Sequence, residues 1–131
     1  GRKYKILYYI VIIIYVILKK KKKKKMINVE VDAGVCGMRT IIKANSEDMQ
    51  KAQLEIQSDC PDIQKAAEEL KEIDGMQEAF GKIGSTKVYE VLGKYCKHAA
   101  CPVPAAIIKA VEAASGLALP KHATITMEKV D

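Results

Sequence analysis

Four cysteines and one histidine are the residues of this 131-residue chain whose types and spacing could do chemistry. They are Cys36, Cys60, Cys96, His98 and Cys101. Thiolate sulfur and imidazole nitrogen are preferred ligands of zinc, and thiolates hold iron–sulfur clusters. These residues predict a site for zinc or an iron–sulfur cluster, two cofactors that they do not distinguish, and they do not identify a substrate.

Cys60 and Cys101 share a local pattern, because a proline follows each of them. Proline suits the first turn of a helix, so each sulfur is expected at a helix start. The unpaired N–H groups and the dipole at such a start favour a thiolate over a thiol. Metal ligation requires the thiolate, so this context favours ligation by both residues.

Cys36 lies in a loop flanked by Gly34 and Gly37, whose backbone could approach a ligand closely. We therefore expect it to join the two Cys-Pro sulfurs as a core ligand, with Cys96 or His98 as the fourth ligand. The chain has no Cys-x-x-Cys pair, which disfavours the common zinc ribbons and fingers. The site would instead be assembled from three separate loops.

Other interpretations of these residues remain open. Cys96 follows the apolar Leu92 by one helical turn and could be a buried small side chain. His98 could form only a local hydrogen bond. Cys101 with His98 could be the nucleophile and base of a thiol-dependent enzyme or redox protein. A clear orienting residue and a phosphate-binding loop are lacking, so the sequence favours a binding protein over an enzyme.

The charge of the chain divides it in two. Residues 1–25 contain one Arg, nine Lys and no acidic residue, whereas residues 26–131 contain 12 basic and 16 acidic residues. The net charge of +6 is thus a property of the N-terminal segment alone. Because the remainder is mildly acidic and has few aromatic residues, we expect no nucleic-acid partner.

We expect residues 1–25 to be a non-native extension, upstream sequence translated in frame, and residues 26–131 to form a single cysteine-containing domain. The apolar run of residues 6–18 is shorter than the roughly 20 residues of a spanning helix. A short membrane anchor, with the following lysines on the cytoplasmic side, is the alternative. A signal peptide is a third interpretation, although a small-residue cleavage site is lacking.

Alternating apolar and polar residues predict strands at residues 27–32, 39–44 and 51–58, joined by short turns into an antiparallel meander. Helices are expected at residues 61–73, 76–83, 87–95 and 104–115, with Ser85 capping the third. Residues 123–129 alternate again and predict a C-terminal strand that joins the sheet. The predicted fold class is α+β: a three-stranded antiparallel meander, then three or four helices on one face, then a C-terminal strand.

Two resemblances add to these predictions. Residues 31–120 resemble a family of short uncharacterised four-cysteine proteins of anaerobic bacteria and archaea, in the segments around Cys36, Cys60 and Cys101 and in the Gly116-Leu-Ala-Leu-Pro120 segment. That family has no established activity, so the resemblance implies no function.

The order of the cysteines is also similar to that of the U-type iron–sulfur scaffold proteins, in which three cysteines from three loops hold a cluster or zinc. Cys36, Cys60 and Cys101 would occupy the matching positions, the last leading into a helix at Ala106. The scaffold family has an Asp after its first Cys-Gly where this chain has Met38. That Asp is associated with cluster transfer, so the resemblance implies binding more than delivery.

The sequence thus predicts a small cytoplasmic protein that holds an iron–sulfur cluster or zinc. Its processes would be cluster assembly or electron transfer, and its partners the proteins of those processes. Cysteine use favours a reducing compartment, where thiols stay free or bind metal. A membrane partner is expected only if the N-terminal segment is native.

Overall fold

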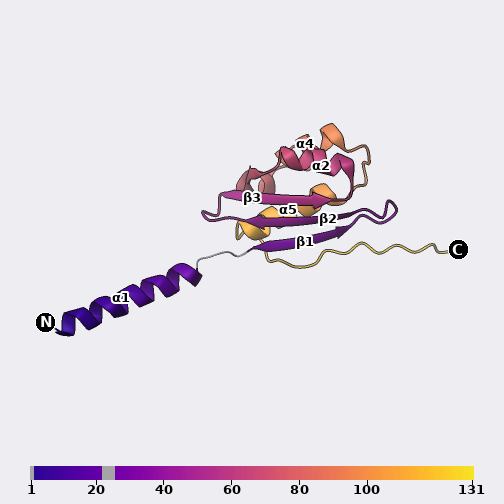
Figure 1. Cartoon of the computed structure of the whole chain (residues 1–131). Coiled ribbons are helices and arrows are strands. Elements are labelled where there is room, and N and C mark those ends of the chain that lie inside the picture. Colours follow the sequence, from indigo (N-terminus) through magenta and orange to yellow (C-terminus); the bar gives the residue numbers. More distant parts are fainter. Residues whose placement is uncertain (1, 22–25) are drawn as a thin grey trace.

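The computed structural model describes residues 2–21 and 26–131 of the chain (Figure 1). One long helix, α1 (Arg2–Lys21), comes first. The sheet strands are β1 (Ile27–Asp32), β2 (Arg39–Asn45), β3 (Lys51–Ser58) and β4 (Glu72–Asp74). The remaining helices are α2 (Pro61–Glu68), α3 (Gly75–Phe80), α4 (Lys87–Tyr95) and α5 (Val103–Ala114).

The four strands form one antiparallel sheet in the order β1-β2-β3-β4. Val29 lies opposite Ile42 in the first pair, and Ala52 lies opposite Ile73 in the last. Each strand therefore pairs with its neighbour in sequence, as short connections favour. The predicted α+β class and its three-stranded meander are confirmed.

The sheet has one apolar and one polar face, because successive side chains of a strand point to opposite sides. Buried strand residues all lie on the face that α5 and α2 cover. They are Val31, Thr40, Ile42, Ala44, Ala52, Leu54 and Ile73. The helices, together with Leu70 just after α2, complete this core with Ile63, Val88, Val91, Leu92, Val103, Ile107 and Val111. The body is thus two layers, with the helices on one side of the sheet.

The fourth strand of the sheet is not at the position predicted from the sequence. Residues 123–129 have no regular structure and are exposed, so the predicted C-terminal strand is wrong. Instead β4 forms within the segment predicted as the end of a helix, since α2 stops at Glu68. Leu70 and Ile73 are both buried, but Ile73 is buried by pairing with β3 rather than by a helical turn. Two apolar residues three apart fit either structure, which is why the pattern misled.

The start of α4 also differs in detail from the prediction. Thr86, not Ser85, is the N-cap, and its hydroxyl accepts the N–H of Tyr89 at 3.5 Å. The buried carboxylate of Glu78 accepts the N–H groups of Lys87 and Val88 at 2.9 and 3.2 Å. These contacts satisfy three donors that a helix start leaves unpaired.

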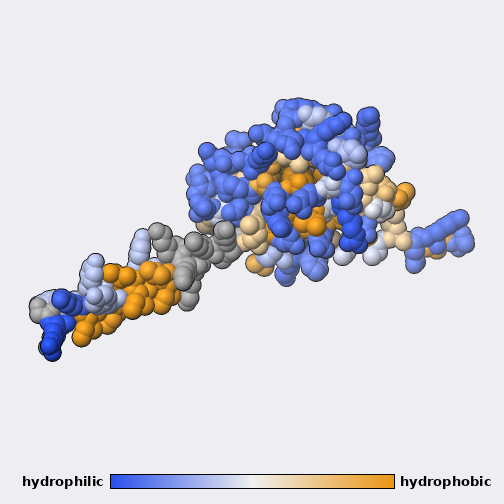
Figure 2. All heavy atoms as spheres, viewed as in Figure 1, coloured by the Kyte–Doolittle hydropathy of each residue, from blue (hydrophilic) through white to orange (hydrophobic). Residues whose placement is uncertain are grey.

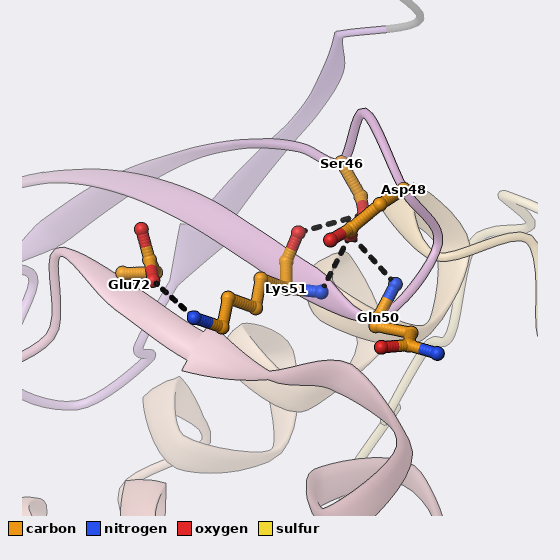
Figure 3. Close-up of polar contacts among 5 residues, drawn as sticks. All are labelled: Ser46, Asp48, Gln50, Lys51 and Glu72. Atoms are coloured by element: carbon orange, nitrogen blue, oxygen red, sulfur yellow. Dashed lines mark hydrogen bonds and ion pairs between the residues drawn. The ribbon is translucent and has the colours of Figure 1, made fainter.

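Side chains close the β2–β3 turn, at the end of the sheet away from the β1–β2 turn (Figure 3). Asp48 Oδ1 accepts the N–H groups of Gln50 and Lys51, both at 2.9 Å, and Ser46 Oγ donates to the Lys51 carbonyl at 2.7 Å. The N–H groups, that of Lys51 first, hold the pKa of Asp48 below its usual value. Lys51 Nζ lies 3.7 Å from a carboxylate oxygen of Glu72, so the turn is also linked to β4.

Helix α1 lies outside the α+β body (Figure 1). Its apolar side chains from Ile6 to Leu18 are all exposed, and Figure 2 shows hydrophobic residues along most of its length. The described part of the chain contains no helix that is both long enough and apolar enough to cross a membrane. All the buried core residues of the described chain belong to the α+β body.

Candidate functional site

Cys60 lies where β3 gives way to α2. The strand ends at Ser58, and Pro61 opens the helix, so Cys60 becomes the N-cap with an extended backbone (φ −81°, ψ 121°). Its N–H donates to Ser58 Oγ at 3.1 Å, and its carbonyl accepts the N–H of Gln64 at 3.0 Å. Its thiol makes no capping hydrogen bond. The half-buried sulfur is thus available at a helix start, as the Cys-Pro pattern predicts.

Cys96 and Cys101 bracket the connection between α4 and α5. Cys96 is the C-cap of α4, and its N–H donates to the carbonyl of Leu92 at 2.8 Å. The N–H of Cys101 donates to the carbonyl of His98 at 3.2 Å, which closes a turn just before Pro102, the N-cap of α5. Both thiols are half-buried, and the His98 side chain is exposed.

The three half-buried thiols of Cys60, Cys96 and Cys101 pack against the same hydrophobic core. Burial first, and then the charges of Cys101, Cys60 and Asp62 in that order, together raise the pKa of Cys96 to about 11. Such an effect requires these groups to lie within electrostatic reach of one another. Cys101 and Cys60 therefore lie within electrostatic reach of Cys96, although the three thiols come from two separate connections of the chain.

Cys36 is exposed on the β1–β2 turn. The turn is shaped by Gly34 and Gly37, both with positive φ, and the N–H of Gly37 donates to the carbonyl of Gly34 at 2.8 Å. Because Thr40 pairs with Ser58, this turn lies at the same end of the sheet as Cys60. The predicted joint ligation by Cys36 and Cys60 requires the two residues to lie at the same end of the sheet.

Hydrogen bonds at this end tie the turn to the β3–α2 connection. Asp59 Oδ2 accepts the N–H of Arg39 at 3.2 Å, and the Asp59 N–H donates to the Arg39 carbonyl at 3.0 Å. Thr40 and Ser58 share a hydrogen bond of 2.7 Å between their hydroxyls. The Asp59 carboxylate therefore binds the backbone N–H of Arg39 in this structure. These hydrogen bonds fix the start of β2, next to the Cys36 turn, relative to the end of β3, next to Cys60.

One group of interacting residues near the cysteines was not predicted from the sequence. Glu69, at the end of α2, accepts a hydrogen bond from the Tyr95 hydroxyl and lies 2.9 Å from Lys94 Nζ. The Tyr95 hydroxyl and then the Lys94 ammonium lower the pKa of Glu69. The group fixes the end of α4 just before Cys96. Glu69 is 25 residues from Lys94, and no local pattern signals that contact.

In the part of the chain that the structure describes, no three Cys, His, Asp or Glu side chains are grouped so that they could hold a metal ion as they stand. Ligation would therefore require the side chains, or the connection between α4 and α5, to move closer together. Two shallow hollows of about 240 and 280 Å³ lie around α3, and neither is lined by a cysteine.

Fold and thiols together define a small α+β protein with three half-buried free cysteines near one end of a four-stranded antiparallel sheet. The model of DUF6951, a family of unknown function, matches residues 27–127, and the chain belongs to this family. Comparisons with curated proteins and with solved structures gave no match. The predicted resemblance to an uncharacterised family is thus confirmed at the level of the family, and the match includes all four cysteines.

Proposed function

We propose that this protein binds zinc or an iron–sulfur cluster through Cys60, Cys96 and Cys101, with Cys36 or His98 completing the coordination. The observation that carries the proposal is that three free, half-buried thiols pack against the hydrophobic core, with Cys101 and Cys60 close enough to influence the charge of Cys96. Thiolates are the ligands that both cofactors prefer. The order of the cysteines, similar to that of the U-type scaffold proteins, is consistent with either cofactor.

Binding would draw the α4–α5 connection inward. Cys96 and Cys101 lie at the two ends of this connection, and the four residues between them are exposed, so they can shift without unpacking the core. The backbone of Cys60 is held by the Ser58 hydroxyl of β3 and the Gln64 N–H of α2, so Cys60 would be the fixed ligand. Each thiol must lose its proton to the solvent when it ligates, so affinity would fall as pH is lowered.

A reducing compartment such as the cytoplasm fits this proposal, because the cysteines must remain unpaired to ligate. The partners would then be proteins that load the site or exchange electrons with it. Whether residues 1–25 tether the protein to a membrane is a separate question.

The test begins with anaerobic purification of the full chain, followed by measurement of iron, zinc and acid-labile sulfide. Metal-free protein is then titrated with Co²⁺, whose thiolate charge-transfer absorption reports sulfur ligands. We expect near-stoichiometric metal, and loss of the absorption in Cys60→Ser and Cys101→Ser. Ala100→Ser, which adds a hydroxyl to the same exposed loop, is the matched control and should titrate normally.

Cys36→Ser and His98→Ala identify the fourth ligand: if it is Cys36, its variant should weaken the charge-transfer band, and if it is His98, its variant should shift the d–d bands of Co²⁺ and leave the charge-transfer band. Protein that is purified without metal or sulfide and gives no band with Co²⁺ would contradict the proposal. If one thiol of such a protein were alkylated unusually fast at neutral pH, the alternative of a thiol-dependent enzyme or redox protein would be favoured. Its residues would be Cys101 and His98, which the hydrogen bond between their backbones already holds in one turn.

A further inference from the structure

Strand β1 leaves one edge of the sheet open. Among the residues that the structure describes, it pairs only with β2 and is the outermost strand. Its core-facing side chains are covered unequally: Val31 is buried, whereas Ile27 and Val29 are only half-buried. An open edge with apolar side chains is a template for another strand, and proteins rarely leave one uncovered.

The C-terminal residues 117–131, here called the tail, have the composition of a strand without a partner. Every residue of the tail is exposed, including Ile125 at 84% and Met127 at 87%. In residues 123–129 these two apolar side chains alternate with Thr124, Thr126 and Glu128, the pattern of a strand with one buried face. The family match extends through residue 127, so most of the tail belongs to the sequence that defines the family.

The β1 edge and the tail are complementary, because each has one apolar face and one polar face. Paired with β1, the tail would place Ile125 and Met127 on the helix side of the sheet, over Ile27 and Val29. The tail residues that alternate with them would extend the opposite face, which is polar in β1 and β2. If the tail paired with β1 one residue out of register, its apolar side chains would move to the polar face of the sheet and its polar side chains to the helix side. The alternation along the strand therefore fixes which side chains of the tail point inward.

Within one copy, the tail does not pair as a strand with this edge in the described structure. In the described part of the chain, no hydrogen bond joins the tail to β1, and the tail bonds only within itself and to the end of α5. Figure 1 shows the tail running in the same direction as β1 and projecting beyond the body. Pairing in one copy would therefore be parallel in an otherwise antiparallel sheet, the less stable arrangement per residue.

A second copy removes this conflict. A two-fold axis perpendicular to β1 reverses the strand in the second copy, so that each tail meets the other copy's β1 antiparallel. Fifteen residues span about 50 Å when extended, more than the length of β1, so the tail can reach across. We propose that two copies exchange their tails, each adding residues 123–129 as a fifth strand at the β1 edge of the other.

The test compares two full-chain double variants by sedimentation equilibrium. Ile125→Lys with Met127→Lys places charges on the buried face of the fifth strand, and Thr124→Lys with Thr126→Lys places the same charges on its polar face. We expect wild-type dimers, a loss of about tenfold or more in self-association for the first variant, and little change for the second. Both variants retain α1, so any association through that apolar helix is common to them.

A labelling experiment separates exchange from pairing within one copy. Unlabelled chains carrying a photo-cross-linking amino acid at position 126 are refolded together with ¹⁵N-labelled chains that lack it. Cross-links to ¹⁵N-labelled peptides of β1 are expected. Three results would overturn the proposal: cross-links confined to unlabelled β1, a monomer at every concentration, or a dimer that both double variants leave intact.

Discussion

At the scale of single residues, the thiol of Cys96 has a higher pKa than the thiol of a cysteine in water. Burial, followed by the neighbouring Cys101, Cys60 and Asp62, raises its pKa from 9.0 to about 11. The sequence allowed both a ligand and a buried small side chain at this position. The structure gives the residue both properties, since it packs on the core and lies near two other thiols.

Cys96 should therefore be slow to alkylate in metal-free protein. A rise of two pKa units lowers the thiolate fraction at pH 8 roughly a hundredfold, because only the thiolate reacts with iodoacetamide. Mass spectrometry of tryptic peptides, with the unfolded protein as reference, measures the rate, which should keep rising as pH approaches 11. A Cys96 that reacts as fast in the folded as in the unfolded protein would contradict this prediction.

The same shift has a definite sign for stability. The unfolded thiol loses its proton near pH 9, whereas the folded thiol keeps its proton up to about pH 11. The folded state therefore binds more protons in this interval, and the contribution of Cys96 to stability is lost as pH rises through it. Metal binding would act in the opposite direction, since it needs the thiolate.

At the scale of elements, the sequence located most helices and strands but not all of their ends. The meander, α4 and α5 follow patterns of strong periodicity and were predicted closely. The segment from Leu70 to Ile73 was assigned to the end of a helix, because its apolar spacing does not distinguish a helical turn from a short strand. The pairing of Ile73 with Ala52 decides between them, and that contact joins residues distant in the chain.

Glu78 is a second element-scale feature that only the fold reveals. Its carboxylate is buried and accepts two backbone N–H groups at the start of α4. Glu78→Ala should lower the free energy of unfolding by about 1–3 kcal/mol, because those donors lose their acceptor away from water. Urea denaturation measures the change. Gln77→Ala, at the exposed neighbouring position, should cost much less, and equal losses in both variants would contradict this role.

At the scale of the whole molecule, α1 and the α+β body are two different kinds of structure. All buried core residues of the described chain lie between Val31 and Val111, and the side chains of α1 from Tyr4 to Leu18 are exposed. The family match likewise begins at residue 27. The body's stability should therefore be independent of the helix.

Deletion of residues 1–25 is expected to change the free energy of unfolding of the body by no more than about 0.5 kcal/mol, as for a surface change that touches no core. Urea denaturation followed by circular dichroism measures this, with the signal of α1 subtracted. Improved solubility should accompany the deletion, since a large exposed apolar surface is removed. A marked loss of stability would show that the helix supports the body.

The sequence by itself determined the α+β class, the meander and the placement of the cysteines in connections, because periodicity and turn chemistry are local properties of the chain. Only the tertiary structure decided that Cys60, Cys96 and Cys101 all pack against the core, that Glu69 holds the end of α4, and that β4 replaces the predicted C-terminal strand. Each of these depends on contacts between residues far apart in sequence. The strand pattern of residues 123–129 was real as a pattern, but a strand forms only where an edge accepts its hydrogen bonds, and within one copy no such bonds join the described tail to β1.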